Sequence, residues 1–382
     1  MQWQTKWVDS ITSIGSSNWQ QLFDSTNPFI QFAYLHGLEH SGVVSEQTGW
    51  QPKHLVVFKG QQIVAALPVY LKQHSWGEYV FDWAWAEAYE RNQLAYYPKL
   101  VTSIPFTPVS GPRLGLHNSL SEVEKQSVCR LILDELINES QRRQYSSWHG
   151  LFLPITDQVN FDHSDTFTRI GTQFHWHNNN YQDFDDFLAK LLSRKRKMIK
   201  KERQVVLQQG FQFQWLQGHE INSMWHKFYA CYQQTYLKRS GHTGYLNLAF
   251  FEHLGQHMLA CIRLLHVTDR HNETVAMALY FVGENKLFGR YWGTFREADG
   301  LHFEACYYQG IEYAIKHGLS VFDAGAQGEH KVSRGFIPVK TRSRHYIVEP
   351  QFADAIKAYC QQEEQHMGLY MQQMLDLSPY KQ

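Results

Sequence analysis

The sequence predicts a mixed α/β (α+β) protein of two similar domains, each a mixed, partly parallel sheet flanked by helices. Three observations lead to this prediction. The 382 residues exceed what one hydrophobic core usually holds. Hydrophobic residues make up 43% of the chain and charged residues 19%, a balance that can bury a core. The order hairpin, loop, helix, strand occurs in each half, so we expect domains over residues 1–175 and 176–382.

The first domain is expected to contain a hairpin, because β-rich runs at 54–58 and 63–71 flank a short polar turn. An insertion rich in aromatic residues is expected at about 74–105. An amphipathic helix follows at about 122–145, where apolar residues recur at helical spacing, and a buried strand follows at 147–153.

The second domain is expected to repeat this order. Two strands at 262–268 and 274–282 form a hairpin, and a third strand lies at 286–292. A helix at 302–317 then leads into a short apolar strand at 319–323. A crossover of this kind implies that the third strand and the last one run parallel. Duplication of one domain explains the repeated order, and a chance likeness of two α+β domains is the alternative.

A long helix is predicted at about 184–209, between the two halves, and its middle is strongly basic. Seven of the ten residues at 194–203 are Lys or Arg, in a chain with 36 basic and 36 acidic residues. One interpretation is a surface that binds RNA phosphates. The alternative is a solvated helix face whose aliphatic stems cover apolar residues. The candidate nucleic-acid contacts are Arg194, Arg196, Lys197 and Lys200.

The sequence argues against a disulfide-bonded, a secreted, a membrane-spanning and a metal-binding protein. The five cysteines are odd in number and form no Cys-x-x-Cys pair, which is typical of free thiols in a reducing compartment. The chain opens without a secretory signal and has no apolar run long enough for a membrane span. We therefore expect a cytoplasmic protein. No metal site is expected either, because the closely spaced histidines lack a matching set of cysteines or carboxylates.

Several segments carry a resemblance to a known family. Residues 323–325 and 333–336 resemble the Asp-Phe-Gly-Gly and Phe-Lys-x-Gly-Phe-Gly elements of Fem-type peptidoglycan aminoacyltransferases. A closer resemblance is to Fem-like N-acyltransferases of the GNAT superfamily, associated with peptidoglycan biosynthesis or recognition. The segments that carry this closer resemblance are 48–50, 74–79, 96–100, 194–197 and 325–331.

This resemblance implies two tandem GNAT-like domains and an enzyme that transfers an acyl or aminoacyl group to a primary amine. It also implies a link to peptidoglycan precursor metabolism. The alternative function is a non-catalytic GNAT-like module that binds a peptidoglycan precursor, a peptide or RNA.

The loop at 325–331 follows a strand and is dense in polar side chains, which favours a functional site. Asp323, Glu329 or His330 could deprotonate an attacking amine. Lys331 or Arg334 could hold an anionic group. A tight turn without function is the alternative. The predicted substrate-binding residues are Tyr97, Lys99, Arg113, Tyr291, Gln327, Lys331 and Arg334.

The aromatic insertion mixes rings with polar residues, among them His74, Glu78 and Asp82. One interpretation is a substrate groove with aromatic walls. The alternative is a second small core.

The acyl donor stays open between acyl-CoA and aminoacyl-tRNA, and no tightly bound cofactor is expected. The loop at 294–302 lacks the glycine spacing of a pyrophosphate-binding loop, and Glu297 and Asp299 would repel a pyrophosphate. Fem-type enzymes, which use aminoacyl-tRNA, also lack that loop. The expected partner is therefore an amine acceptor, as a small molecule or a peptide, together with tRNA where the donor is aminoacyl-tRNA.

Overall fold

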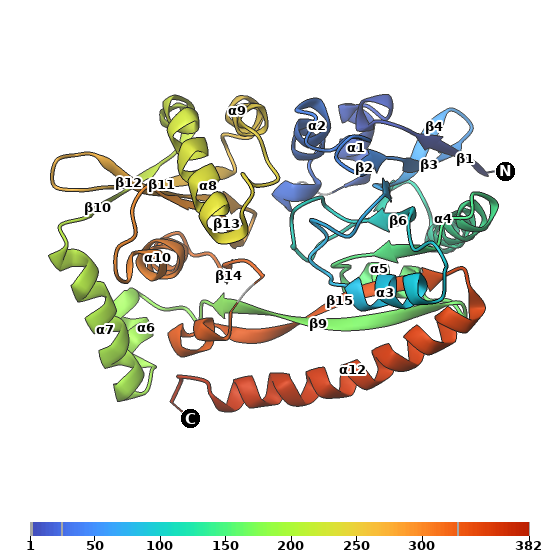
Figure 1. Ribbon diagram of the computed structural model, residues 1–382. Coiled ribbons are helices and arrows are strands. Elements are labelled where there is room, and N and C mark those ends of the chain that lie inside the picture. The colour runs from blue at the N-terminus through green and yellow to red at the C-terminus, as the bar shows by residue number, and fades with distance from the viewer. Residues whose placement is uncertain (1–2, 24–25, 327, 382) are drawn as a thin grey trace. The chain divides into compact units, whose positions relative to one another are not determined.

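The computed structural model describes residues 3–23, 26–326 and 328–381 (Figure 1). The chain forms two compact units. Unit 1 comprises Met1–Gly171 with Lys340–Leu369, and unit 2 comprises Thr172–Val339 with Tyr370–Gln382. The first boundary lies close to the expected one at 175/176, but the sequence did not predict that residues 340–369 belong to unit 1.

This return of the chain to unit 1 has a clear cause. The last residues of strand β15 (Ile337–Ile347) pair antiparallel with β8 (Ser147–Gly150), from Arg344 opposite Gly150 to Ile347 opposite Ser147. Helix α12 (Pro350–Asp376) then follows.

Unit 1 contains a four-stranded antiparallel sheet in the order β1 (Trp3–Val8), β3 (His54–Lys59), β4 (Gln62–Leu67), β7 (Gly115–Leu116). The predicted hairpin is therefore confirmed, but its second strand is shorter than expected. It ends before Pro68, which has no backbone N–H to donate to a neighbouring strand.

A second group of strands in unit 1 contains the parallel pair. Strands β2 (Trp50–Pro52), β5 (Tyr70–Lys72) and β6 (Lys99–Thr102) pair antiparallel in that order, and β6 pairs parallel with β8. The connection between β6 and β8 contains the predicted helix, α4 (Glu122–Arg142).

Helix α4 begins at a capping box, in which Ser121 and Glu124 each bond the other's backbone N–H. Its apolar face, with Ile132 and Leu136, packs on Leu55 and Leu67 of the hairpin in one buried cluster. The other helices of unit 1 are α1 (Ser16–Leu22), α2 (Phe32–His40), α3 (Trp83–Arg91) and α5 (Ile155–Asn160), with short 3-10 turns at Ile11–Ser13 and Pro28–Ile30.

Unit 2 is built on a mixed sheet. Its strands are β10 (Gln212–Leu216), β11 (Ile262–Thr268), β12 (Thr274–Val282), β13 (Lys286–Thr294), β14 (Val321–Asp323) and the end of β9 (Thr166–His177). Neighbours in this order pair antiparallel, except β13 and β14, which pair parallel. The predicted hairpin, third strand and parallel crossover are all confirmed.

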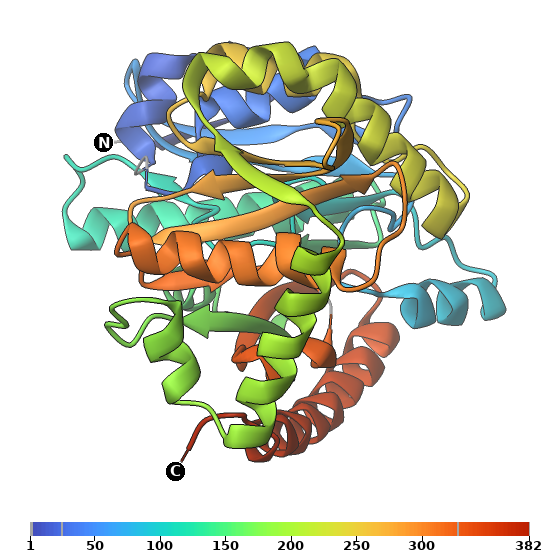
Figure 2. The ribbon, with the colours of Figure 1, turned by 90° about the vertical axis from the view of Figure 1, so that its left-hand side faces the viewer.

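Helices cover both faces of this sheet (Figure 2). Helices α8 (Trp225–Ser240) and α9 (Leu248–His257) lie on one face, and a helical run from Leu301 to Lys316 lies on the other. Helix α8 comes very close to β13, since a Cβ at Gly293 would lie 2.3 Å from the Cys231 carbonyl carbon. The helical run comprises α10 (Leu301–Phe303), one π-helical turn (Glu304–Tyr308) and α11 (Gln309–Lys316).

The prediction of one long helix at 184–209 is wrong. The chain forms α6 (Phe184–Ala189) and α7 (Ser193–Gln208), separated at 190–192. The break arises because Leu191 forms a β-bridge with Tyr380, and the Leu192 N–H donates to the Pro379 carbonyl at 2.8 Å. Two 3-10 segments, Gly218–Met224 and Glu329–Arg334, complete unit 2.

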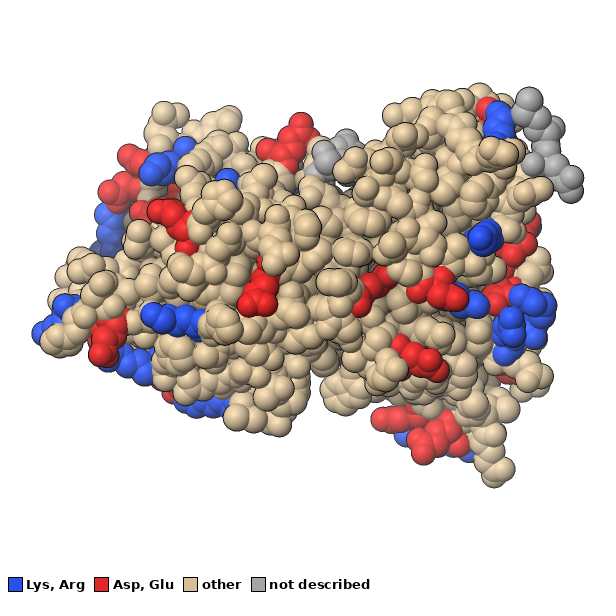
Figure 3. Space-filling model, turned by 90° about the horizontal axis from the view of Figure 1, so that it is seen from above, with Lys and Arg blue, Asp and Glu red and all other residues tan. Residues whose placement is uncertain are grey.

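Charged side chains are interspersed by sign on the face seen in Figure 3, as a chain with zero net formal charge allows. In the described part of the chain, no helix combines the length and hydropathy that crossing a bilayer requires. The five cysteines are free thiols.

Candidate functional site

Strand β13 of unit 2 continues beyond the point where its parallel partner ends. The two strands pair only from Lys286 opposite Val321 to Phe288 opposite Asp323. Two residues later β13 carries a bulge, because Gly289 faces Tyr280 on β12 while Tyr291 faces Leu279. Arg290 is the extra residue. A bulge re-aims a side chain, and bulges are common beside active sites.

The Arg290 side chain reaches the end of β14, where it pairs with Asp323. Arg290 Nη2 lies 2.5 Å from Asp323 Oδ2, and both side chains are buried. Burial alone would raise the pKa of Asp323, but Arg290 and His175 hold that pKa well below its usual range. Asp323 is therefore an ionised carboxylate that is already paired with Arg290. It is a poor base, and its role is to position the Arg290 side chain.

Lys331 and Arg334 hold the loop that follows. The Lys331 ammonium donates to the carbonyls of Gly325 at 2.6 Å and Ala324 at 3.1 Å. Burial lowers the pKa of Lys331 to about 8, although Asp323 opposes this shift. Arg334 forms an ion pair with Glu202 at 2.7 Å and stacks on Phe303. These contacts fix loop geometry, so neither cation is available to a ligand without rearrangement.

His330 and Glu329 are the exposed members of the predicted base set. His330 Nε2 shares a hydrogen bond of 2.8 Å with the Tyr307 hydroxyl. Partial burial, with Arg334 and Lys331 nearby, lowers the pKa of His330, so its imidazole is neutral at pH 7. Glu329 accepts a hydrogen bond from the Tyr370 hydroxyl at 3.0 Å. Gln327, a predicted substrate contact, lies outside the described residues.

A cavity of about 440 Å³ lies where the helical run of unit 2 begins. Its lining comes from β13, from the following loop, from the first helical residues and from the end of α8. The lining residues are Gln234, Thr235, Lys238, Arg239, Trp292, Thr294–Asp299, Leu301 and His302. This is the loop in which the sequence predicted repulsion of a pyrophosphate.

The structure changes that expectation for Glu297. Its carboxylate lies 2.5 Å from Lys238 Nζ, so its charge is paired. Arg296 pairs with Asp269 at 3.3 Å. Burial and the nearby Arg239 lower the pKa of His302 to about 4, which gives the cavity a neutral imidazole. Tyr291, a predicted substrate contact, is buried among the rings of Tyr232 and Phe251.

Helix α7 keeps part of its basic surface. Arg194, Lys197 and Lys201 are exposed and hold no ion pair with any residue that the structure describes. Lys200 lies 3.0 Å from Asp185, at an exposed position where such a pair is weak. Arg203 is withdrawn from this surface, because it pairs with Glu304 and Glu312.

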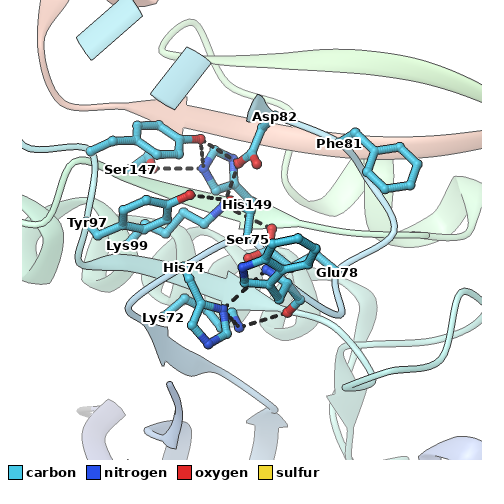
Figure 4. A network of polar contacts seen from close by, with 12 residues as sticks. Lys72, His74, Ser75, Glu78, Phe81, Asp82, Tyr97, Lys99, Ser147 and His149 are labelled. Carbon is cyan, nitrogen blue, oxygen red and sulfur yellow. Dashed lines mark hydrogen bonds and ion pairs between the residues drawn. The ribbon is translucent and has the colours of Figure 1, made fainter. Parts of the chain in front are cut away.

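Unit 1 contains a second candidate site, a buried polar network around Lys99 (Figure 4). Lys99 Nζ donates to Ser75 Oγ and to Glu78 Oε2, both at 2.9 Å, and it pairs closely with Asp82. The Tyr97 hydroxyl shares a 2.8 Å hydrogen bond with Ser75. The predicted contacts Tyr97 and Lys99 thus lie in one network.

Charge states in this network are strongly perturbed. Burial raises the pKa of Glu78 to about 7, although Lys99 opposes the shift. Burial would also raise the pKa of Asp82, but Lys99 and His149 hold it well below its usual range. Lys99 stays cationic, because the two carboxylates outweigh the effect of burial on its pKa.

Lys72 lies beside this network without contacting a carboxylate that the structure describes. Its ammonium nitrogen is 3.2 Å from the Trp76 carbonyl, 3.3 Å from His74 Nδ1 and 3.6 Å from the centre of the Trp50 ring. Burial lowers the pKa of Lys72 to about 6, so at pH 7 it is largely a neutral amine. Such neutral lysines occur at binding and catalytic sites.

The network also includes a buried histidine pair. His149 Nδ1 lies 2.6 Å from His345 Nδ1, and the Tyr96 hydroxyl joins His149 to Asp82. Burial lowers the pKa of His149 to about 3, so this ring is neutral. Arg113, another predicted contact, instead donates to the carbonyls of Val109, Gly111 and Pro112 and so stabilises its own segment.

Sequence reasoning missed several residues of these two sites. His302 and Arg239 line the cavity, but no motif marks either of them. Lys72 ends a short strand, and His149 lies within a strand that was predicted only as buried. The resemblance was a usable signal, because its segments at 48–50, 74–79 and 96–100 meet around this network, and so was the mix of rings and polar residues in the aromatic insertion. No group of His, Cys, Asp and Glu in the described residues is arranged to hold a metal ion.

Comparisons with known proteins agree with this fold. A family model named FemAB_like, described as peptidoglycan biosynthesis/recognition, matches residues 10–382. No curated protein sequence matches the chain significantly.

Solved structures are similar at low sequence identity. FemX matches with a TM-score of 0.53 and 11% identity, over 92% of this chain and 100% of its own. A conserved protein of unknown function from Bacteroides thetaiotaomicron VPI-5482 matches with a TM-score of 0.53 and 10% identity, over 90% of this chain and 100% of its own. These two likenesses show the fold, and the predicted α/β class is confirmed.

Proposed function

The chain belongs to the FemAB-like family, and on that premise we propose that it is an N-acyltransferase. It transfers an acyl or aminoacyl group from an activated donor to a primary amine of a peptidoglycan precursor. The observation that carries this proposal is the cavity of unit 2, which is lined both by the bulged strand β13 and by the start of the helical run at Leu301.

The position of the cavity suits an acyl group that becomes negatively charged during transfer. Backbone N–H groups at the start of a helix point out of it and favour negative charge. Here the helical run begins after Gly300, which has the left-handed backbone conformation (φ 73°) that glycine adopts without strain. When the amine attacks the acyl carbon, the carbonyl oxygen becomes an oxyanion, which such groups would stabilise.

The reaction needs a base, because an ammonium group cannot attack a carbonyl carbon. The amine nitrogen forms a bond to that carbon, and the bond from the carbon to the donor's oxygen or sulfur breaks. The amine loses a proton to the base, and the leaving group gains one. We assign the base to His330, since it is neutral and exposed and is bonded to Tyr307, whose neighbour His302 lines the cavity.

The proposed donor is aminoacyl-tRNA. The exposed cations Arg194, Lys197 and Lys201 on α7 support this choice, because they are free to contact phosphates. The alternative donor, acyl-CoA, gains some support from the pairing of Glu297 with Lys238, which removes one source of repulsion.

Purified protein decides between these donors. It would be incubated with a peptidoglycan precursor peptide that has a free side-chain amine, and with aminoacyl-tRNA or acetyl-CoA. Mass spectrometry should detect a new amide on the peptide only with aminoacyl-tRNA. Transfer from acetyl-CoA alone would replace the proposed donor. Tight binding of precursor without turnover of either donor would favour the non-catalytic binding module instead.

A further inference from the structure

The aromatic insertion of unit 1 holds two buried carboxylates that are only half satisfied. Glu78 and Asp82 are each 3% exposed. One oxygen of each accepts a hydrogen bond from Lys99. The other oxygens, Glu78 Oε1 and Asp82 Oδ1, have no hydrogen-bond partner among the described residues. A buried acceptor left without a partner is destabilising, so a native protein rarely keeps two together.

We propose that Glu78 and Asp82 form a binding site for a primary ammonium group carried by the acyl acceptor. An ammonium group offers three N–H donors, which fits two unpaired carboxylate oxygens close to one lysine. The ammonium ion is then held by charge-assisted hydrogen bonds, which are roughly twice as strong as neutral ones. This inference rests on the proposed function, since the ligand is an ammonium group of the same acceptor, separate from the amine that His330 deprotonates.

The charges around the site agree with a cationic ligand. The titratable or charged groups that face Glu78 and Asp82 are Lys72, Tyr96, Tyr97, Lys99 and His149. At neutral pH, Lys72 and His149 are largely uncharged for the reasons given above, so Lys99 is the main cation. Above the pKa of Glu78, two ionised carboxylates against one ammonium leave an excess negative charge. A bound ammonium group would neutralise it.

Aromatic side chains, some of them exposed, lie close to the carboxylates in the same insertion. Trp76 and Phe81 lie at either side of Glu78 in the sequence and are 57% and 66% exposed. The ring centres of Trp76 and Trp83 are 4.9 Å apart, and Tyr97 is half-buried beside Ser75. Aromatic faces attract cations and also pack against aliphatic chains. The ligand class is therefore a primary ammonium on an alkyl chain.

Binding of 1,5-diaminopentane to the full chain, measured by isothermal titration calorimetry, tests the inference without any acyl donor. The uncharged 1,5-pentanediol is the control ligand. We expect saturable binding of the diamine alone. The variant Glu78→Gln keeps the shape of the side chain and removes its charge, and it should weaken binding by about 10- to 100-fold. The variant Glu87→Gln, at an exposed carboxylate of the same insertion, should bind as the wild type does.

A second measurement does not depend on any variant. Because the pKa of Glu78 is raised to about 7, its carboxylate forms between pH 6 and pH 8. Affinity for the diamine should rise by up to about 10-fold over that interval, since the diamine stays protonated throughout. Equal binding of diamine and diol, equal binding by wild type and Glu78→Gln, or an affinity that does not change with pH would each overturn the inference. If transfer occurs but its KM for the amine is unchanged in Glu78→Gln, the ammonium site fails while the proposed function stands.

Discussion

Lys72 and Lys99 lie directly opposite each other on the antiparallel strands β5 and β6, yet they differ in charge. Two like charges at opposed positions of a sheet destabilise it. Lys99 is cationic because Glu78 and Asp82 surround it. Lys72 has no such partner among the described residues, and burial lowers its pKa to about 6. The pair is tolerated because one lysine gives up its proton.

This relationship predicts the effect of Lys72→Met, which keeps the length of the side chain. The Trp76 carbonyl and His74 Nδ1 would keep other donors, from Trp50 Nε1 and from the Trp76 N–H. The unfolded chain binds the Lys72 proton below pH 10.5, but the folded chain binds it only below about pH 6, so wild-type stability rises with pH across that window. The variant should therefore be more stable by about 1–4 kcal/mol at pH 7.

Urea unfolding of wild type and Lys72→Met at pH 7 and pH 10 would test this. The difference between them should shrink at the higher pH. Lys6→Met, at an exposed position of β1, serves as the control and should change little. A variant less stable than wild type at both pH values would contradict a neutral Lys72.

Asp323→Asn should destabilise the protein, because it removes the carboxylate that forms a buried ion pair with the Arg290 guanidinium. Breaking a buried pair in this way costs about 3–5 kcal/mol. The pKa of Asp323 is depressed, so its stabilisation is present above the ordinary value of 3.8 and is lost as the pH falls further. Denaturant titration at pH 7 measures the loss, with Glu284→Gln as an exposed control. A change below 1 kcal/mol would show that Arg290 finds another partner.

His330→Gln should lower kcat of the transfer by about 100-fold or more, with little change in KM, if His330 is the base. Because its pKa lies below 6.5, wild-type kcat should stay level above neutral pH and fall as the imidazole gains a proton in acid. Steady-state kinetics between pH 5 and pH 8 would show this, a range chosen around that pKa. Full activity of His330→Gln together with a loss in Glu329→Gln would move the role to Glu329.

Replacing Arg194, Arg196, Lys197 and Lys200 by Gln should flatten the salt dependence of tRNA binding. The logarithm of the association constant falls by about 0.7–0.9 per phosphate contact for each log unit of salt. The fold should be unaffected, since exposed charges contribute little to stability. Filter binding at several salt concentrations measures the slope. The control removes three charges where the α7 variant removes four, and it replaces Arg91, Lys125 and Arg130, cations of unit 1 that already have exposed partners. If both variants show the same salt dependence, the cations of α7 do not contact tRNA.

Local pattern was sufficient to predict strands β11 to β14 of unit 2, whereas β9 and β10 were not predicted. Strands β11 and β12 begin and end at the predicted residues, because alternating apolar residues and the turn at 269–272 determine them. The break before α7 was not predictable, since it depends on Leu191 pairing with Tyr380, far away in the sequence. The state of Lys72 was equally hidden, because a depressed pKa arises from burial that no local pattern reports.

The interleaving of the two units has a consequence for synthesis. Unit 1 needs residues 340–369, which leave the ribosome only after all of 172–339 have been made. Strand β8 lacks its partner β15 until the ribosome has translated all of unit 2. A nascent chain therefore exposes an unpaired edge of β8 for that time, a state in which strands readily pair with other chains. Chaperone dependence during production of this protein would follow from its topology and not from weak packing.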